Sequence, residues 1–135
     1  MRAVFDTNVI VAAVLSSRGA PARLLEAWTE GAFELVTSPH LLGELRRVLA
    51  YPKIRAHITP ADAAGVVSLI ETGSVIVEDP QAPPVVTSDD PEDDFVIALA
   101  QHTRSILVSG DSDLLVLANR IPVMSPAEFA LRLGL

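Results

Sequence analysis

The sequence predicts an α/β fold, a three-layer α/β/α sandwich with a central, mainly parallel sheet. Short apolar segments of strand type alternate with helical patterns along the chain. This alternation is typical of parallel strands joined by helices that cover both faces of the sheet. The chain has 135 residues, half of them hydrophobic, and a chain of this length buries roughly 70% of the surface that it exposes when unfolded. We therefore expect a single domain over residues 1–135.

The predicted strands are short, apolar and bounded by polar or turn residues. Five segments fit this description, and the last of them is a short one: Ala3–Phe5, Phe33–Thr37, Val75–Val77, Ile106–Val108 and Pro122–Met124.

The first helix is predicted over the apolar run Val9–Leu15, with Asp6 or Thr7 as its N-cap. A second helix is predicted over Arg23–Glu30, and Gly31 follows it as a stop signal.

Three later helices are predicted to begin with one device, a capping hydroxyl followed by proline at the first helical position. The pairs are Ser38-Pro39, Thr59-Pro60 and Ser125-Pro126, and Glu128 completes a capping box with Ser125. Gly73 is predicted to stop the helix over Ala61–Thr72. The proline-rich, acidic stretch from Glu78 to Asp94 is expected to be a loop that leads into the next helix.

Composition excludes several classes of protein. The chain contains no cysteine, which removes disulfides, thiolate catalysis and cysteine-ligated zinc. No apolar run approaches the ~20 residues of a membrane span, and the start lacks the features of a signal peptide, so we expect a cytoplasmic protein with no membrane association. The net charge of −7 is opposite in sign to the usual nucleic-acid binder. A phosphate-bearing substrate therefore requires local arginine or a bound cation.

Acidic residues stand where the predicted strands end. Asp6 follows the first strand, and Asp111 and Asp113 follow the strand Ile106–Val108. Each could simply cap the next helix. However, the carboxyl ends of parallel strands are where open α/β sheets bind ligands, and clustered carboxylates are the ligands that Mg²⁺ or Mn²⁺ prefers. The pattern favours a metal-dependent enzyme.

Acids elsewhere in the chain strengthen this interpretation. Glu44 shares a helix face with the apolar residues Leu41, Leu45 and Val48, where an unpaired carboxylate is costly to bury. It lies either at the edge of that face or in a polar site, and the other acids favour the site. The segment 88–94 holds five carboxylates, which is more than helix capping requires, although the spacing does not say which one is in excess.

In combination, Asp6-Thr7-Asn8, Glu44, residues 90–94 and Ser109-Gly110-Asp111-Ser112-Asp113 resemble the motifs of the PIN-domain nucleases. The resemblance spans nearly the whole chain and is closest to the VapC-like toxins of toxin–antitoxin pairs. It implies a parallel sheet between helices, an acidic pocket that binds Mg²⁺ or Mn²⁺, and cleavage of RNA. It also implies a small antitoxin protein as a partner, and together with the apolar composition it leads us to expect a homodimer.

The resemblance also assigns roles to residues. Asp6 matches the family's first acid, Glu44 the second and Asp111 the fourth. The third acid lies seven residues before an alanine, and counting back from Ala100 gives Asp93, with Asp90 as the alternative. Asp94 departs from the family pattern, because this branch commonly has Asn there. Asp6, Glu44, Asp93 and Asp111 are the expected catalytic residues, and these four with Asp113 are the expected metal ligands.

Two other functions remain open from the sequence. A PIN-like module could bind partners without catalysis, although the full set of acids argues against this. A phosphotransfer domain of receiver type also places acids at strand ends, but it requires a lysine after a late strand, and none follows Ile106–Val108. Positive charge for RNA has to come from arginine, and we expect it from Arg46 and Arg47, and from Arg18 and Arg23.

Overall fold

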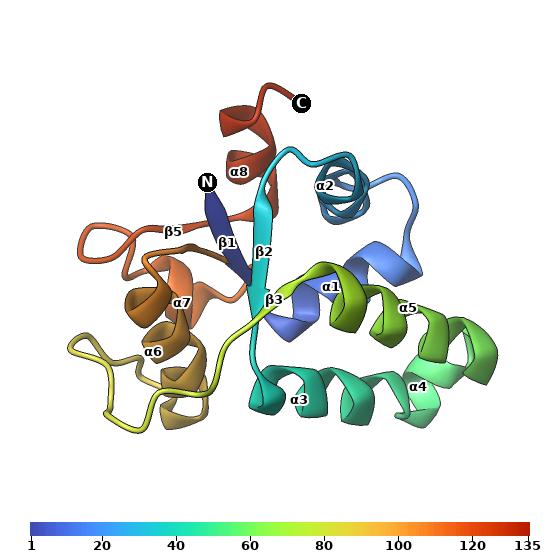
Figure 1. The fold of residues 1–135 in the computed structure, drawn as a ribbon, viewed down its shortest axis with the longest axis horizontal. Coiled ribbons are helices and arrows are strands. Elements are labelled where there is room, and N and C mark those ends of the chain that lie inside the picture. The colour runs from blue at the N-terminus through green and yellow to red at the C-terminus, as the bar shows by residue number, and fades with distance from the viewer.

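Five strands form an all-parallel sheet in the computed structural model, which describes residues 1–135 (Figure 1). The order across the sheet is β3-β2-β1-β4-β5. The predicted strands are confirmed to within a residue or two at their ends. Their bounds are β1 (Arg2–Phe5), β2 (Glu34–Thr37), β3 (Val75–Ile76), β4 (Ile106–Val108) and β5 (Val123–Met124).

Eight α-helices and one 3-10 turn connect the strands. They are α1 (Thr7–Leu15), α2 (Ala20–Thr29), α3 (Pro39–Leu49), α4 (Pro52–Arg55), α5 (Pro60–Gly73), η1 (Pro91–Asp93), α6 (Asp94–Thr103), α7 (Ser112–Leu115) and α8 (Pro126–Arg132).

The helices cover both faces of the sheet, so the expected three layers are present. Successive residues of a strand point to opposite faces. Ala3 and Phe5 of β1 join one core with residues of α1, α2, α3, α5 and α8, while Val4 joins a second core with residues of α6 and α7. Figure 1 shows α6 and α7 on one side of the sheet and α1, α2 and α5 on the other.

The predicted caps on three helices are confirmed. The side chains of Ser38, Thr59 and Ser125 each accept a hydrogen bond from the backbone N–H three residues later. Glu128 also accepts from the N–H of Ser125, which completes the capping box. Gly31 ends α2 with a φ of +86°, a conformation that favours glycine. None of the helices combines the length and apolar character that a membrane crossing requires.

Two helix ends differ in detail from the predictions. The second helix begins at Ala20 and not at Arg23, because Pro21 is tolerated in a first turn. Gly73 is the last residue of α5 and not a left-handed stop after it. A Cβ atom at this position would lie 2.8 Å from Cζ2 of Trp28, so the missing side chain allows α5 to approach α2 closely.

Candidate metal centre

The carboxyl ends of β1 and β4 form the centre of the site. These two strands are neighbours in the sheet, and from β1 the chain builds outward through β2 on one side and β4 on the other. Such a reversal of strand order opens a crevice at the carboxyl edge of a parallel sheet. Asp6 follows β1 directly, and its N–H donates to the carbonyl of Val108 at the end of β4 (3.0 Å). The carboxylate of Asp6 is thereby held against the turn that follows β4.

Ser109 links this carboxylate to the turn. The fully buried Ser109 hydroxyl donates to Oδ2 of Asp6 (2.9 Å) and accepts from the N–H of Asp111 (3.0 Å). Oδ1 of Asp111 in turn accepts from the N–H of Asp113 (2.9 Å), which caps α7. Asp6 occupies the N-cap position of α1 but makes no capping hydrogen bond with its side chain. The capping role that the sequence left open for Asp6 is therefore not filled, whereas Asp111 does cap a helix.

Asp6 resists ionisation. Burial raises the pKa of its carboxyl above the ordinary value, and although the hydrogen bond from Ser109 opposes this, the charges of Glu44 and Asp111 raise the pKa further. Glu44 is half-buried on α3, whose first turn begins at the end of β2. Its charge contributes to the raised pKa of Asp6, and on this ground we assign Glu44 to the site.

The segment before α6 brings in two further carboxylates. Oδ1 of Asp90 accepts from the N–H of Glu92 (3.0 Å) and caps η1. Asp93 occupies the N-cap position of α6, yet its side chain makes no capping hydrogen bond. Its Oδ2 atom is buried without any hydrogen-bond partner. Asp93 is therefore the carboxylate in this segment that capping does not explain.

Repulsion from several neighbours acts on Asp93. Burial raises the pKa of Asp93 to about 7, with further contributions from the negative charges of Asp111, Asp6 and Asp90 and from a side-chain hydrogen bond with Asp111. Buried carboxylates with like-charged neighbours are strongly unfavourable when ionised, and a divalent cation removes this penalty. Perturbed acids of this kind gather at functional sites.

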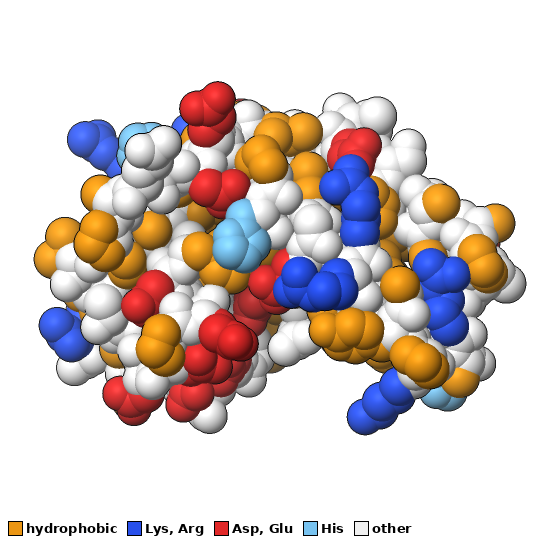
Figure 2. Space-filling model, turned by 90° about the horizontal axis from the view of Figure 1, so that it is seen from below, with side chains coloured by type: hydrophobic (Ala, Val, Ile, Leu, Met, Phe, Trp, Pro, Cys, Tyr) orange, Lys and Arg blue, Asp and Glu red, His pale blue; other side chains and the backbone are white.

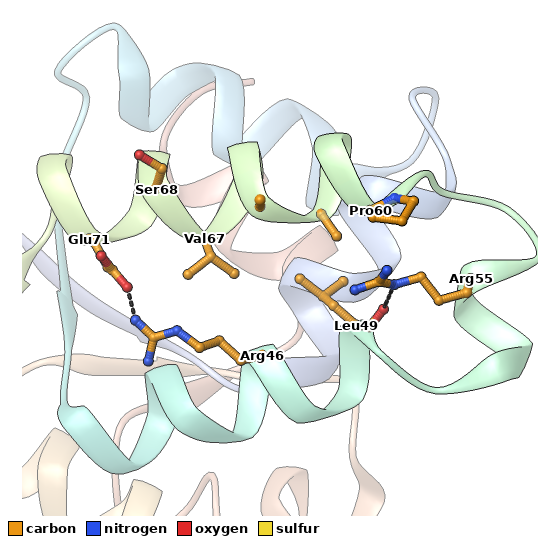
Figure 3. Close-up of a pocket in the computed structure, with 9 residues that line it drawn as sticks. Arg46, Leu49, Arg55, Pro60, Val67, Ser68 and Glu71 are labelled. Atoms are coloured by element: carbon orange, nitrogen blue, oxygen red, sulfur yellow. Dashed lines mark hydrogen bonds and ion pairs between the residues drawn. The ribbon is translucent and has the colours of Figure 1, made fainter.

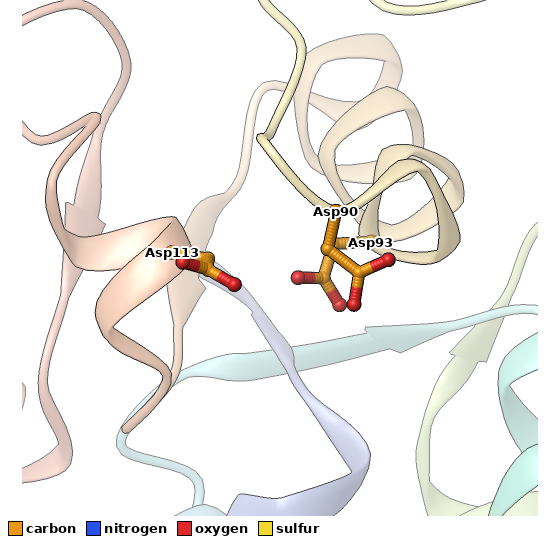
Figure 4. A group of neighbouring side chains, drawn as sticks. All are labelled: Asp90, Asp93 and Asp113. Atoms are coloured by element: carbon orange, nitrogen blue, oxygen red, sulfur yellow. The ribbon is translucent and has the colours of Figure 1, made fainter.

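Three carboxylates come close enough to share one ion. Oxygen atoms of Asp90, Asp93 and Asp113 all lie within 4.8 Å of one another, and Figure 4 shows Asp90 and Asp93 side by side, with Asp113 across from them. The charges of Asp6 and Asp111 act on Asp93, and the charge of Glu44 acts on Asp6. We call the whole group the acid cluster: Asp6, Glu44, Asp90, Asp93, Asp111 and Asp113.

The five acids expected from the sequence all lie in the acid cluster, and Asp90 joins them. Asp90 and Asp93 were alternatives for one role, but the structure places both in the group of three acids with Asp113. The excess of acid in residues 88–94 was the signal for this. Asp94 has a different task, because its Oδ1 accepts from the N–H of Ser88 (3.0 Å) and anchors the preceding loop.

Unpaired oxygen atoms fit a bound cation. Besides Oδ2 of Asp93, the hydroxyl of Thr7 has no hydrogen-bond partner, although Thr7 is only 1% exposed. Thr7 directly follows Asp6. Buried polar atoms normally find partners, so two unpaired oxygens in or beside a group of carboxylates are what a site for a hard cation such as Mg²⁺ or Mn²⁺ would show.

Positive charge lies beside the acids and not among them. The face seen in Figure 2 carries a patch of acidic side chains, with basic side chains on the neighbouring part of the surface. Arg46 is engaged with Glu71 across a hollow of about 340 Å³ between α3 and α5 (Figure 3). Arg47, three residues after Glu44, is exposed and forms no ion pair. Of these two arginines, Arg47 is the one free to contact phosphate.

The chain is similar in sequence to a known protein family and to a protein of known sequence. Residues 2–113 match the family described as "PIN domain". The uncharacterized protein MJ1680 of Methanocaldococcus jannaschii is 28% identical over 140 residues, which cover 96% of this chain and 89% of that protein.

Two solved structures share the fold. PAE2754 from Pyrobaculum aerophilum has a TM-score of 0.66 at 14% identity, with 99% of this chain and 90% of that chain covered. VapBC2 from Rickettsia felis, bound to a DNA fragment from its promoter, has a TM-score of 0.64 at 12% identity, with 93% and 98% covered. The matched residues include every strand of the sheet except β5 and every member of the acid cluster. The chain belongs to the PIN-domain family.

Proposed function

We propose that this protein is a Mg²⁺- or Mn²⁺-dependent endoribonuclease. The observation that carries the proposal is the state of Asp93: a carboxyl group with a buried, unpaired oxygen and a pKa raised to about 7, in a cluster of acids at the strand ends. Membership of the PIN-domain family supports it, because PIN domains are generally metal-dependent nucleases.

The residues of the acid cluster would have different roles in holding the cation. Asp90, Asp93 and Asp113 would hold the cation most directly, since their oxygens already lie together, and Asp6, Glu44 and Asp111 would complete the site. A bound divalent ion supplies charge for the scissile phosphate, a lowered pKa for the attacking water and stabilisation of the leaving oxygen. Ser109 fixes the orientation of the Asp6 carboxylate through a hydrogen bond.

We further propose that the protein is the toxin of a toxin–antitoxin pair, acts in the cytoplasm without membrane association, and forms a homodimer. The fold shared with VapBC2 supports a small antitoxin as partner. Light scattering at micromolar concentration tests the dimer, and a strict monomer contradicts it. Co-expression with the product of an adjacent small gene tests the antitoxin, and failure of the two to co-purify counts against it.

The cleavage experiment uses a mixed RNA pool with the purified protein. We expect cleavage with Mg²⁺ or Mn²⁺ and none after EDTA is added. A DNA pool and a small phosphoester run beside it separate a ribonuclease from a deoxyribonuclease and from a phosphatase. Equal cleavage in EDTA, or no cleavage of RNA with either ion, overturns the proposal.

A further inference from the structure

Two aromatic rings lie stacked at the border of the acid cluster. The rings of His40 and Phe95 have centroids 3.9 Å apart and planes that differ by 2°. His40 comes from α3 and Phe95 from α6, so the pair bridges helices on either side of the site.

The positions of the two residues place this stack beside the acids. His40 lies four residues before Glu44 on α3, which puts both on one face of the helix. Phe95 lies two residues after Asp93, in the first turn of α6. The stack is thus joined on both sides to helices that carry members of the acid cluster.

Hydrogen bonds fix the backbone that carries His40 at the start of α3. The N–H of His40 donates to Oδ2 of Asp79 (2.9 Å), and Ser38 accepts from the next two N–H groups through its hydroxyl and its carbonyl. The first turn of α3 therefore has no free N–H to bind an anion. Phe95 is half-buried and packs against the second core, whereas His40 is exposed. Phe95 supports one face of the imidazole ring, and the solvent exposure of His40 leaves its other face accessible.

We infer that the outer face of His40, supported by Phe95, is the platform on which an unpaired base of the RNA strand stacks next to the scissile phosphate. This inference rests on the proposed function and adds to it the residue that positions the RNA strand. A stacking contact with a base suits this chain, because the net charge of −7 and the acids at the site repel the phosphate backbone. Every base has a π face, and stacking on aromatic side chains is how proteins hold unpaired bases without reading sequence.

The test measures binding of a short single-stranded RNA that carries one 2-aminopurine, in the Asp6→Asn background with Mg²⁺ so that the strand stays intact. An abasic strand of equal length is measured in parallel. We expect His40→Ala to weaken binding of the base-bearing strand by roughly 5- to 100-fold and to abolish the quenching of 2-aminopurine fluorescence. Binding of the abasic strand should not change. His40→Phe, which keeps a stacking ring, should restore both affinity and quenching.

His102→Ala is the matched control, since His102 is also an exposed histidine but lies in the last turn of α6, and it should bind like the parent. Equal affinity of His40→Ala and the parent for the base-bearing strand overturns the inference. So does an equal loss for both strands, which would mean that His40 contacts phosphate. A lowered melting temperature of His40→Ala with unchanged quenching also overturns it, because the stack then serves only to join α3 to α6.

The two proposals fail separately. If the wild-type protein cuts RNA and the His40 variants bind as the parent does, only the inference about base stacking on His40 is contradicted. If no divalent ion supports cleavage while base-dependent binding and quenching persist, the proposed ribonuclease activity is contradicted and the base-stacking role of His40 is supported. Absence of RNA binding by every variant overturns both.

Discussion

Asp93 carries a carboxyl group that helix capping does not explain. Asp90 and Asp111 each accept a backbone hydrogen bond at the start of a helical segment, whereas Asp93 makes no such bond and leaves Oδ2 buried and unpaired. Removal of the charge of Asp93 therefore distinguishes a role as metal ligand from a role as helix cap.

Asp93→Asn keeps the size of the side chain and removes its charge. We expect the metal-free variant at neutral pH to be as stable as the wild type or more stable, because repulsion within the acid cluster is relieved. The rise in melting temperature on addition of Mn²⁺ should largely disappear, and RNA cleavage should fall by about a hundredfold or more. Calorimetry and a cleavage assay measure these effects.

The control for Asp93→Asn is Asp89→Asn, an identical change at an exposed position outside the acid cluster. Asp90→Asn cannot serve as the control, because Asp90 lies beside Asp93 and Asp113. An Asp93→Asn protein that retains both activity and the shift with Mn²⁺ would remove Asp93 from the site.

The raised pKa of Asp93 has a consequence for stability. In the folded, metal-free protein this pKa is about 7, whereas the pKa of Asp in an unfolded chain is about 3.9. Between these values the folded state binds more protons than the unfolded state, so the free energy of unfolding falls as pH rises. The raised pKa of Asp6 acts in the same direction.

We therefore expect the melting temperature in EDTA to decrease from about pH 5 to about pH 8, with a shallower decrease in Asp93→Asn. A pH titration of the melting temperature checks this. A melting temperature that rises across the same range, or a variant with the wild-type slope, would contradict the assignment.

At the scale of elements, the contact between α5 and α2 depends on a glycine. Gly73 lies where a Cβ atom would come within 2.8 Å of the buried Trp28 ring. Gly65 lies in the middle of the same helix, and nothing lies within 4 Å of a Cβ atom there. The two positions thus share one helix and differ in packing.

Gly73→Ala should destabilise the protein by about 1–3 kcal/mol, because the Trp28 ring is rigid and has to shift. Gly65→Ala should stabilise it by about 0.5–1 kcal/mol, since alanine is the better helix former. Urea denaturation measures both. If Gly73→Ala is as stable as Gly65→Ala, the close packing of α5 on Trp28 is not what requires glycine.

At the scale of the whole molecule, charge opposes both folding and RNA binding. The net charge is −7, and six of the carboxylates gather at one edge of the sheet. The arginines near them lie to one side, and one of them is engaged in an ion pair. We therefore expect a cation at the site to stabilise the folded protein and to favour approach of the phosphate backbone.

In EDTA, we expect the melting temperature to rise as NaCl increases from about 0.02 M to about 0.5 M, because salt screens the repulsion. Millimolar Mg²⁺ should produce a larger rise than the same ionic strength of NaCl, since it binds the folded state. Equal effects of the two salts at matched ionic strength would show that screening alone is at work.

Local features of the sequence determined most of the fold. The strands were predictable because short apolar, β-branched segments between turn residues favour a buried strand. The helix starts at Ser38, Thr59 and Ser125 were predictable because each cap is a hydrogen bond that spans only three residues. Such signals depend on neighbours along the chain. The limits of α2 and the role of Gly73 were not predictable in this way, because the requirement at Gly73 is set by Trp28, which lies on a different helix.

For the site, the sequence by itself supplied the acids at the strand ends, and only the tertiary structure decided how they are used. Whether Asp90 or Asp93 belongs to the site was open in the sequence, and in the structure oxygen atoms of both lie within 4.8 Å of one another and of Asp113. The pairing of β1 with β4 brings Asp6 to Ser109, 103 residues away along the chain. Burial and the charges of neighbours then set the pKa of Asp93. Desolvation and repulsion depend on distances through space, and strand order, which local propensity does not specify, determines those distances.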